Sequence, residues 1–394
     1  MTLTLRQKFS LIQMTYWCSV CAMFVFIAAY LYGLGYTPFT VGIALALQKV
    51  FGFIGQLLWA FLGRTRRQLK RNFILGNILL WLVFIFIYFM KFPWIVIIGI
   101  GFSGLFESAM PTLLDTWILK SYAENPEIYG SIRSSASFAF AWFAILMGRW
   151  IGQIGYVIMP VASLFLMLLS VTLSISIKTD PIKTSEITAS PRIHHSWKNL
   201  MKNRHYVSIV LAMLLYGICS LPFNLVLPLL INRTGGAIEV LGYATFASAI
   251  SQFPMMAFYR RYARIEPYFL IQIAVLLTIM AYVICLTVNR PEAIIVAQVF
   301  SGLGFGILLP TLRNMIFKMV DHSQHTLSQS IVDLVQISLA GIIGNTLVGL
   351  IAEHFGVNAV LGTFIVLLIS AELVLSLAYL SRNEGPHAIK EITD

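Results

Sequence analysis

The sequence predicts an all-α polytopic membrane protein in which twelve transmembrane helices form two pseudo-symmetric six-helix bundles. Three observations lead to this fold class: the composition, the lengths of the apolar segments and an internal repeat. Of the 394 residues, 58% are hydrophobic and only 11% are charged, whereas a soluble globular protein has about 25% charged residues. So few charges cannot solvate the surface of a soluble chain of this length.

Apolar segments follow one another along the chain, and each is long enough to cross a bilayer, which takes about 20 predominantly apolar residues. They fall into two sets of six. We therefore expect an N-terminal bundle over 1–177, a cytoplasmic linker over 178–205 and a C-terminal bundle with a short cytoplasmic tail over 206–394. The predicted spans lie near 9–33, 40–63, 72–91, 93–119, 131–153, 155–177, 206–231, 236–259, 268–288, 291–319, 326–353 and 356–381.

A short pattern occurs once in each half of the chain. The tetrapeptide FSGL at 102–105 is followed by PTL at 111–113, and both return at 300–303 and 310–312. Tandem halves of this kind are typical of transporters built from internal repeats. Glycines repeat in the same way, with Gly148 and Gly155 matching Gly349 and Gly356.

Lysine and arginine residues are concentrated in alternate loops, which sets the orientation by the positive-inside rule. We therefore expect both termini in the cytoplasm and the chain in the bacterial cytoplasmic (inner) membrane. The net charge of +11 is then a topology signal, and no nucleic-acid partner is expected. The residues assigned to the inner side are Arg6, Lys8, Arg64, Arg66, Arg67, Lys70, Arg71, Lys178, Lys183, Arg192, Lys198, Lys202, Arg204, Arg260, Arg261 and Arg264, against Lys91, Arg233 and Arg290 outside.

Residue types that bind metals or perform catalysis do not converge in the sequence. Cys18 and Cys21 form a C-x-x-C inside an apolar span without a histidine or second cysteine pair nearby, so no metal or redox site is expected. His194 and His195 belong to the polar linker, where we also expect no metal. The patterns H-E-x-x-H, G-x-S-x-G and the P-loop are absent. The sequence therefore predicts neither an enzyme nor a cofactor, and we expect a monomer in lipid.

Ionisable side chains inside apolar spans indicate function, because charge at membrane depth is costly. Glu107 is expected near the middle of the fourth span, counting about 1.5 Å per residue, and is the first candidate for a transported-proton site. Lys49 in the second span is its expected partner, and Arg149 in the fifth span is the alternative. For both cations the other interpretation is a side chain that extends to the outer interface.

Two motifs in the first half resemble those of a known family. Pro111-Thr-Leu-Leu-Asp115 and Tyr129-Gly-Ser-Ile-Arg133 resemble the lactose permease and phenylpropionate permease branch of the major facilitator superfamily, and 241–256 is similar to its eighth helix. The resemblance covers the whole chain. It implies two bundles that rock about a central site and uptake of a small organic solute, an oligosaccharide, nucleoside or aromatic acid, driven by the proton gradient.

The resemblance also implies that Asp115 and Arg133 hold the substrate and that Phe140 or Trp142, further along the fifth span, stacks against it. By the repeat, the counterparts of the two charges are Arg313 and Asp333, with the signs exchanged. We therefore expect two crossed acid–base pairs, one in each half. They either bind substrate or gate the inner mouth, and the alternative is that they are static ion pairs. Asp115 is also a candidate for proton coupling, and Asn224 and Gln336 are further candidates for substrate binding.

Export of a metabolite or drug is the alternative to uptake. Drug–proton antiporters usually have a Gly-Pro pair in the fifth span, whereas the segment 134–155 contains no proline. This argues against a typical drug antiporter and leaves export of a metabolite open. The directions that Tyr16 and Trp17 face in the first span are not fixed by the sequence.

Overall fold

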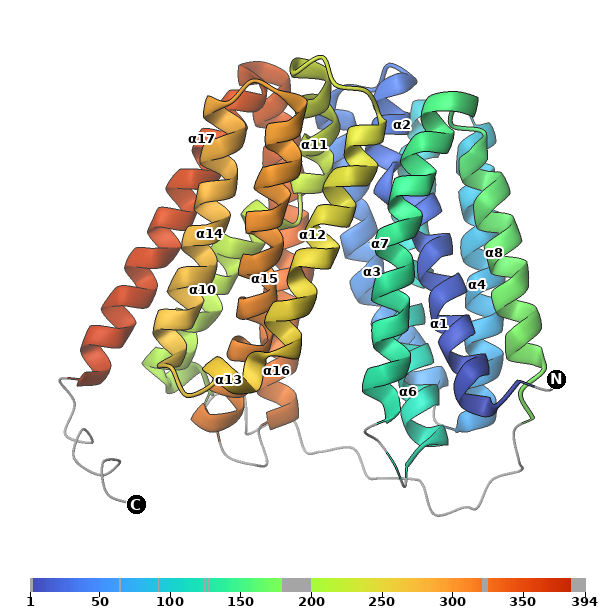
Figure 1. Ribbon diagram of the computed structural model, residues 1–394, viewed down its shortest axis with the longest axis horizontal. Coiled ribbons are helices and arrows are strands. Elements are labelled where there is room, and N and C mark those ends of the chain that lie inside the picture. Colours follow the sequence, from blue (N-terminus) through green and yellow to red (C-terminus); the bar gives the residue numbers. More distant parts are fainter. Residues whose placement is uncertain are drawn as a thin grey trace.

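A computed structural model of the protein describes residues 3–63, 65–90, 92–123, 125, 128–178, 200–320 and 325–383. All of its secondary structure in this part of the chain is helical, and the helices run roughly side by side as two groups (Figure 1). Residues 179–199 of the predicted linker, which include His194 and His195, lie outside the described residues, as do the loop residues Arg64 and Lys91 and the C-terminal tail.

The first group of helices extends from residue 3 to residue 178. It comprises α1 (Leu5–Val20), the π-helix η1 (Cys21–Val25), α2 (Ile27–Gly33), α3 (Pro38–Leu62), α4 (Arg66–Phe89), α5 (Pro93–Glu107), α6 (Met110–Ser121), α7 (Ile128–Ile154) and α8 (Ile158–Ile175).

The second group extends from residue 200 to residue 383. It comprises α10 (Arg204–Ser220), α11 (Phe223–Arg233), α12 (Glu239–Ala257), α13 (Tyr259–Tyr262), α14 (Pro267–Thr287), α15 (Pro291–Met319), α16 (His325–Asp333), the π-helix η3 (Leu334–Leu339) and α17 (Ala340–Asn383).

Within the described part of the chain, 10 helices are long and apolar enough to cross a membrane. The protein is therefore a multi-pass helical membrane protein. The count differs from the expected twelve for two reasons. The predicted spans near 326–353 and 356–381 form one helical element, Leu327–Ser381, which bends at Gly356, where φ is 80°. The helix α12 is not among the ten, because polar side chains such as Glu239 and Gln252 interrupt its apolar sequence.

Three of the long helices are broken part-way along their length, at places that matter for the site. The first span is interrupted between α1 and α2: α1 continues into the π-helix η1, and one non-helical residue, Phe26, precedes α2. The helix α5 ends at Glu107, and α6 begins at Met110 with Pro111 in its first turn. In the second group, α10 ends at Ser220 and α11 begins after Pro222. Broken helices leave backbone groups free, which in a membrane protein is tolerated where they line a cavity.

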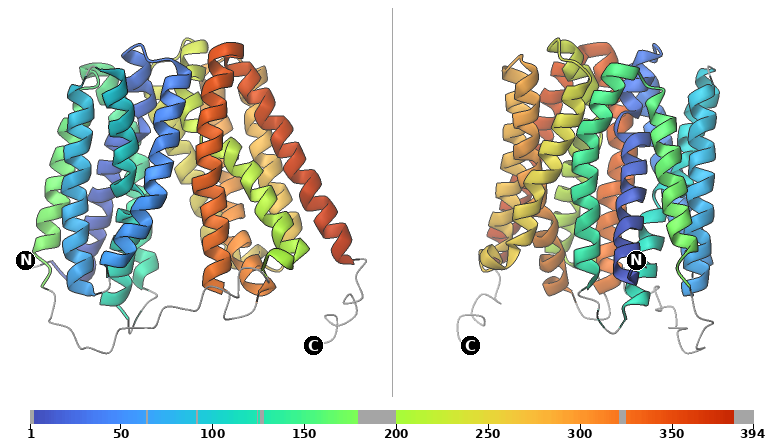
Figure 2. Two further views of the ribbon diagram at one scale, coloured as in Figure 1. Left: turned by 180° about the vertical axis from the view of Figure 1, so that it is seen from behind. Right: turned by 45° about the vertical axis from the view of Figure 1, so that its right-hand side comes forward.

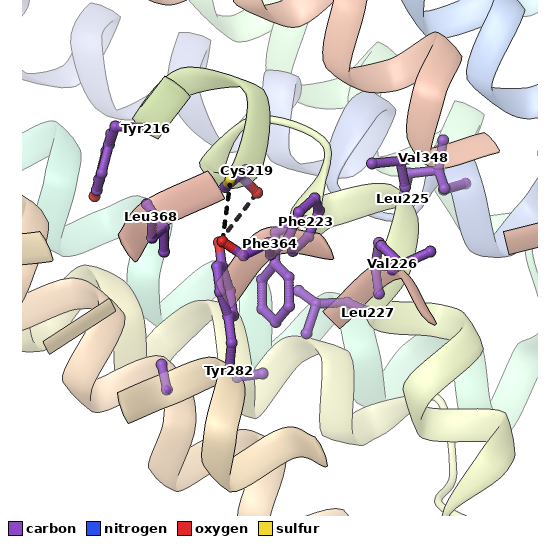
Figure 3. Packing of buried hydrophobic residues seen from close by; sticks show 14 of the residues in the cluster. Tyr216, Cys219, Phe223, Leu225, Val226, Leu227, Tyr282, Val348, Phe364 and Leu368 are labelled. Atoms are coloured by element: carbon purple, nitrogen blue, oxygen red, sulfur yellow. Dashed lines mark hydrogen bonds between the residues drawn. The ribbon is translucent and has the colours of Figure 1, made fainter. Parts of the chain in front are cut away.

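Packing behind the last of these breaks is tight (Figure 3). The hydroxyl of Tyr282 in α14 donates to the carbonyl of Cys219 at 3.0 Å, which supplies a partner for a backbone group near the end of α10. The thiol of Cys219 in turn lies 3.6 Å from the carbonyl of Phe364 in α17. The ring of Phe223 packs 4.9 Å from that of Tyr282. These contacts hold the end of α10 and the start of α11 against α14 and α17.

The repeat seen in the sequence is also present in the backbone. Four glycines have a positive φ, a conformation that glycine adopts without strain. Gly35 (φ 86°) follows α2 and Gly235 (φ 68°) follows α11, while Gly155 (φ 85°) separates α7 from α8 and Gly356 (φ 80°) bends α17. Corresponding turns therefore carry the same backbone geometry in both halves.

The two groups of helices meet at one end only. In Figure 1 they lie together at the upper end, opposite the N-terminus, and separate towards the lower end, and Figure 2 shows the same from behind. Contacts between the groups are concentrated in two seams, α3 against α17 and α7 against α12, and α2 also contacts α11. Glycines permit the close approach: a β-carbon at Gly42 would lie 2.4 Å from the carbonyl oxygen of Asn345, and one at Gly242 would lie 2.4 Å from that of Ala144.

Candidate functional site

A cavity of about 160 Å³ lies between the two groups of helices, at the level of the breaks described above. We call it the central cavity. It brings together the π-helix η1 and α2, the end of α5, and both sides of the α10–α11 break. Its lining residues are Phe24, Ile27, Ala28, Leu45, Gln48, Lys49, Glu107, Leu221, Asn224 and Asn345. Five of these ten residues are apolar, and the other five supply one cation, one carboxylate and three amides.

Lys49 and Glu107, the pair expected from the sequence, both line this cavity. The two residues do not form an ion pair. The carboxylate of Glu107 accepts a hydrogen bond of 3.2 Å from the hydroxyl of Ser108. The stem of Lys49 crosses to the other group of helices, since a β-carbon at Gly341 would lie 2.9 Å from its Cγ. Both charges thus keep hydrogen-bonding capacity for a solute in the cavity.

Arg149, the alternative partner of Glu107, does not reach the central cavity. Its Nε donates to the hydroxyl of Tyr243 in α12 at 3.1 Å, and its guanidinium lies 5.8 Å from the centre of that ring. This contact belongs to the seam between α7 and α12. The alternative pairing of Arg149 with Glu107 is therefore wrong for this conformation, and the reason is that the seam supplies a nearer partner.

Amide side chains complete the polar part of the cavity. Asn224, a candidate from the sequence, is exposed to the cavity from α11, the shorter half of a broken span. Asn345 and Gln48 were not singled out by sequence reasoning. The amide nitrogen of Asn345 donates to the carbonyl of Gly341 at 2.7 Å, and that of Gln48 lies 3.3 Å from the hydroxyl of Ser103. These bonds hold the amides in place and leave their oxygens as acceptors.

A second polar cluster lies inside the first group of helices. Its members are Gln13, Trp17, Asp115 and Arg133, and we call it the N-half cluster. The amide nitrogen of Gln13 donates to Asp115 at 2.7 Å, and the indole nitrogen of Trp17 donates to the amide oxygen of Gln13 at 3.0 Å. The guanidinium of Arg133 lies over the Trp17 ring, 4.5 Å from its centre. The chain of contacts therefore runs from the carboxylate to the cation through an amide and an indole.

The expected ion pair between Asp115 and Arg133 is wrong for this structure. The two charges influence each other electrostatically, but no ion pair joins them: Gln13 donates to Asp115, Trp17 lies under Arg133, and the hydroxyl of Tyr129 interacts with both charges. Gln13 is fully buried. A long-range donor of this kind is not visible in the spacing of two motifs, so sequence reasoning missed it.

The corresponding charges of the second half do form an ion pair. The Nη2 atom of Arg313 lies 2.7 and 2.9 Å from the two carboxylate oxygens of Asp333. Gln329 holds the arginine further, through a bond of 3.0 Å from Nη1 to its oxygen and one of 2.9 Å from its nitrogen to the arginine carbonyl. Asp333 is the last residue of α16, directly before the π-helix η3. Arg313 and Asp333 are therefore in direct contact, whereas Asp115 and Arg133 form no ion pair.

The remaining candidates lie in three different places. The ring of Phe140 packs edge-on against Trp17, with centres 6.4 Å apart, and so adjoins the N-half cluster. The ring of Trp142 lies 5.0 Å from that of Phe246 in α12, and therefore belongs to the contact between the two groups. Gln336 lies in η3, one turn beyond Asp333, where its carbonyl approaches Gly217.

The described part of the chain contains no recognisable metal-binding site. No group of three His, Cys, Asp or Glu side chains is placed to hold an ion there. Cys18, Cys21, Cys219 and Cys285 are free and buried.

Two bundles of membrane-spanning helices around a polar cavity at broken helices define a membrane transport protein. The chain belongs to the MFS_1 like family, whose model matches residues 7–362, and is therefore a secondary transporter of the major facilitator superfamily. As a member it is not an enzyme and uses no cofactor.

Solved structures show the same fold at low sequence identity. The structure of the nucleoside transporter NupG matches with a TM-score of 0.82 at 12% identity, covering 97% of this chain and 100% of that chain. A bacterial homologue of the human lysosomal transporter Spinster, inward-facing and unoccupied, gives 0.69 at 11%, covering 95% and 94%. A bacterial metal transporter gives 0.69 at 11%, covering 96% and 99%. Comparison with curated proteins gave no match.

Proposed function

We propose that this protein is a proton-coupled importer of a small, polar, uncharged or zwitterionic solute, with nucleosides as the first class to test. It works by alternating access between two six-helix halves, 1–177 and 206–394, with both termini in the cytoplasm of a bacterial cell. Counting the 55-residue element as two spans at Gly356, and adding α12, gives twelve spans. The basic loops then face inward, at the end where the two halves are apart.

The central cavity is the observation that carries this proposal. It presents Lys49, Glu107 and the amides of Asn224 and Asn345 to one small space between the two halves. Amides and a separated charge pair suit a solute with several hydroxyl or amide groups, because such a solute satisfies polar groups that are otherwise costly to leave unpaired. A lipophilic cation would leave the amides without partners.

Glu107 is the proposed site of the transported proton. An ionisable side chain at membrane depth is costly and marks a functional site, proton pathways among them. Lys49 shares the cavity without forming an ion pair with Glu107. A solute that binds between the two groups contacts Glu107, and this contact links solute binding to the proton-carrying group. Asp115, in the N-half cluster, is the second proposed proton-carrying group.

Nucleosides are placed first among the solutes for two reasons. A nucleoside transporter is among the proteins of similar fold, and the cavity combines hydrogen-bonding amides with the ring of Phe24. Oligosaccharides and aromatic acids remain in the test panel, and so do amphipathic cations, which represent the alternative of export.

The experiment is a thermal-shift screen of the purified protein. A ligand that binds only the folded state raises the free energy of unfolding by mass action, by about 2.7 kcal/mol when its concentration is 100 times its Kd. The melting temperature rises accordingly. We expect uridine, adenosine or a related neutral solute to raise Tm. Asn224→Ala is expected to abolish the shift. Asn232→Ala, at the exposed far end of the same helix, is the matched control and keeps it. Shifts with amphipathic cations alone would contradict import and support export.

A further inference from the structure

The helix α11 contains a proline, Pro228, in its interior. Proline has no backbone N–H, so the carbonyl four residues earlier loses its helical hydrogen bond. In α11 that carbonyl belongs to Asn224, a residue that lines the central cavity. A backbone carbonyl released at membrane depth needs another donor. The Asn224 carbonyl is therefore a polar group of the cavity in addition to the side-chain amide of the same residue.

Two other described helices contain an interior proline, Pro254 in α12 and Pro310 in α15. Their released carbonyls belong to Ile250 and Gly306, and neither residue lines the central cavity. The helix α2, the counterpart of α11 in the first half, contains no proline. Within the described part of the chain, Asn224 is therefore the one residue at which a proline in a helix interior releases a carbonyl beside this cavity.

The position of Asn224 on α11 directs the released carbonyl towards the cavity. Asn224 is exposed, whereas its neighbours Phe223 and Leu225 are buried. Residues four apart lie on one face of a helix, so the ring of Pro228 follows Asn224 on the cavity side. Because a proline ring clashes with the carbonyl four residues before it, the Asn224 oxygen is expected to tilt outward on this side of the helix.

Contacts on two sides hold the start of α11 in place. The hydroxyl of Tyr32 in α2 donates to the carbonyl of Leu225 at 3.1 Å, across the two halves. The next carbonyl along the chain therefore already has a side-chain donor. On the other side α17 packs against Pro222, since a β-carbon at Gly344 would lie 2.7 Å from its Cγ. The Asn224 carbonyl is thus presented on a fixed backbone, which lowers the cost of binding a partner.

We propose that the backbone carbonyl of Asn224, released by Pro228, is a binding subsite for an N–H or O–H group of the transported solute. This rests on the proposed function and adds the requirement for a hydrogen-bond donor at one position of the solute. Water occupies the acceptor in the empty cavity, and the solute replaces it. A solute that lacks the donor leaves the carbonyl unpaired, so the site discriminates against it.

The test combines analogues of uridine with Pro228→Ala, which restores an N–H to the helix. The four analogues each lack one donor: 3-methyluridine, 2′-deoxyuridine, 3′-deoxyuridine and 5′-deoxyuridine. For the wild type we expect at least one analogue to bind about 10-fold more weakly than uridine, equivalent to about 1.4 kcal/mol. Pro228→Ala should weaken uridine binding by a similar factor and leave the binding of that analogue unchanged. The dissociation constants come from Tm measured over a series of ligand concentrations.

Pro254→Ala is the matched control, because it restores an N–H to a helix whose released carbonyl does not line the cavity. It should leave all five dissociation constants unchanged, and Tm should change alike in the two variants. Equal weakening of all five ligands by Pro228→Ala would overturn the subsite, by showing that only the shape of α11 matters. Equal affinity of the wild type for uridine and all four analogues would overturn it without any variant. Failure of all five ligands to bind the wild type would instead contradict the proposed nucleoside class on which the subsite rests.

Discussion

The backbone N–H of Phe39 donates a hydrogen bond of 2.9 Å to the carboxylate of Glu353, so a side chain of one half caps a helix of the other. Phe39 lies in the first turn of α3, where backbone N–H groups lack partners within the helix and attract negative charge. Glu353 lies on α17 at the upper end, close to the bend at Gly356. The bond therefore joins the two halves where they are closed.

Neutralising this carboxylate is expected to loosen the closed end. In Glu353→Gln the acceptor of the Phe39 N–H becomes an uncharged amide, which weakens the hydrogen bond. The fraction of molecules whose upper end is open should therefore rise. Spin labels at Val157 and Phe355, which are exposed at this end in the two halves, report the distance by pulsed electron paramagnetic resonance. Glu292→Gln, a carboxylate in the first turn of α15 within one half, is the control. Identical distance distributions for all three proteins would exclude Glu353 as a latch.

Close backbone contact between the halves is expected to require Gly42. In Gly42→Ala the new methyl group would meet the Asn345 carbonyl at 2.4 Å and the Gly349 Cα at 3.1 Å. Overpacking of this kind costs about 1–3 kcal/mol, which should lower Tm or move the spin-label distances towards an open upper end. Gly362→Ala has no atom within 4 Å of the new carbon and should be neutral or stabilising. Equal behaviour of the two variants would refute a tight seam.

The two acid–base pairs are expected to respond differently to exchange of their charges. Arg313→Asp with Asp333→Arg can re-form a direct ion pair, so the double variant should recover part of the Tm lost by either single change. The coupling is expected to be about 0.5 kcal/mol, because both side chains are partly exposed. Asp115→Arg with Arg133→Asp should show no recovery, since Gln13 and Trp17 would each face the wrong charge. Recovery in the first half would mean that Asp115 and Arg133 pair directly in solution.

Removing the charge of Glu107 is expected to separate accumulation from exchange. In Glu107→Gln, uptake against a gradient should disappear, whereas exchange of bound solute should persist, since the amide preserves the shape of the cavity. Glu372→Gln is the control: it changes a carboxylate of α17 that does not line the central cavity. Accumulation by Glu107→Gln at the wild-type level would remove Glu107 from proton coupling.

The fold was accessible from the sequence because the physical constraint on it is simple. Apolar length predicts a membrane helix, and the repeat of FSGL with PTL, together with paired glycines, predicts two equivalent halves. One of these glycine pairs, Gly155 and Gly356, does occupy equivalent turns with positive φ. The sequence did not predict where helices break: the ends of α5 and α10 both lie inside predicted spans, and Pro111 and Pro222 follow them within a few residues.

The site was less accessible, because it depends on which residues of distant helices meet. Glu107, Lys49 and Asn224 stood out as polar groups in apolar spans, and the structure brings them to one cavity. Asn345 and Gln13 carried no distinguishing signal, since a single amide can face lipid, a neighbouring helix or a cavity. Gln13 is 102 residues from Asp115 along the chain, so the spacing of the two motifs could not reveal that it donates to this carboxylate.

Proton-driven uptake by the wild-type protein is the most direct test of the account. Purified protein in liposomes is given labelled uridine outside, with the interior more alkaline than the exterior. We predict accumulation of uridine above the external concentration, and its collapse to equilibrium on addition of a protonophore. Accumulation that is unaffected by the protonophore, or movement of uridine out of loaded vesicles against its own gradient when protons flow inward, would contradict a proton-coupled importer.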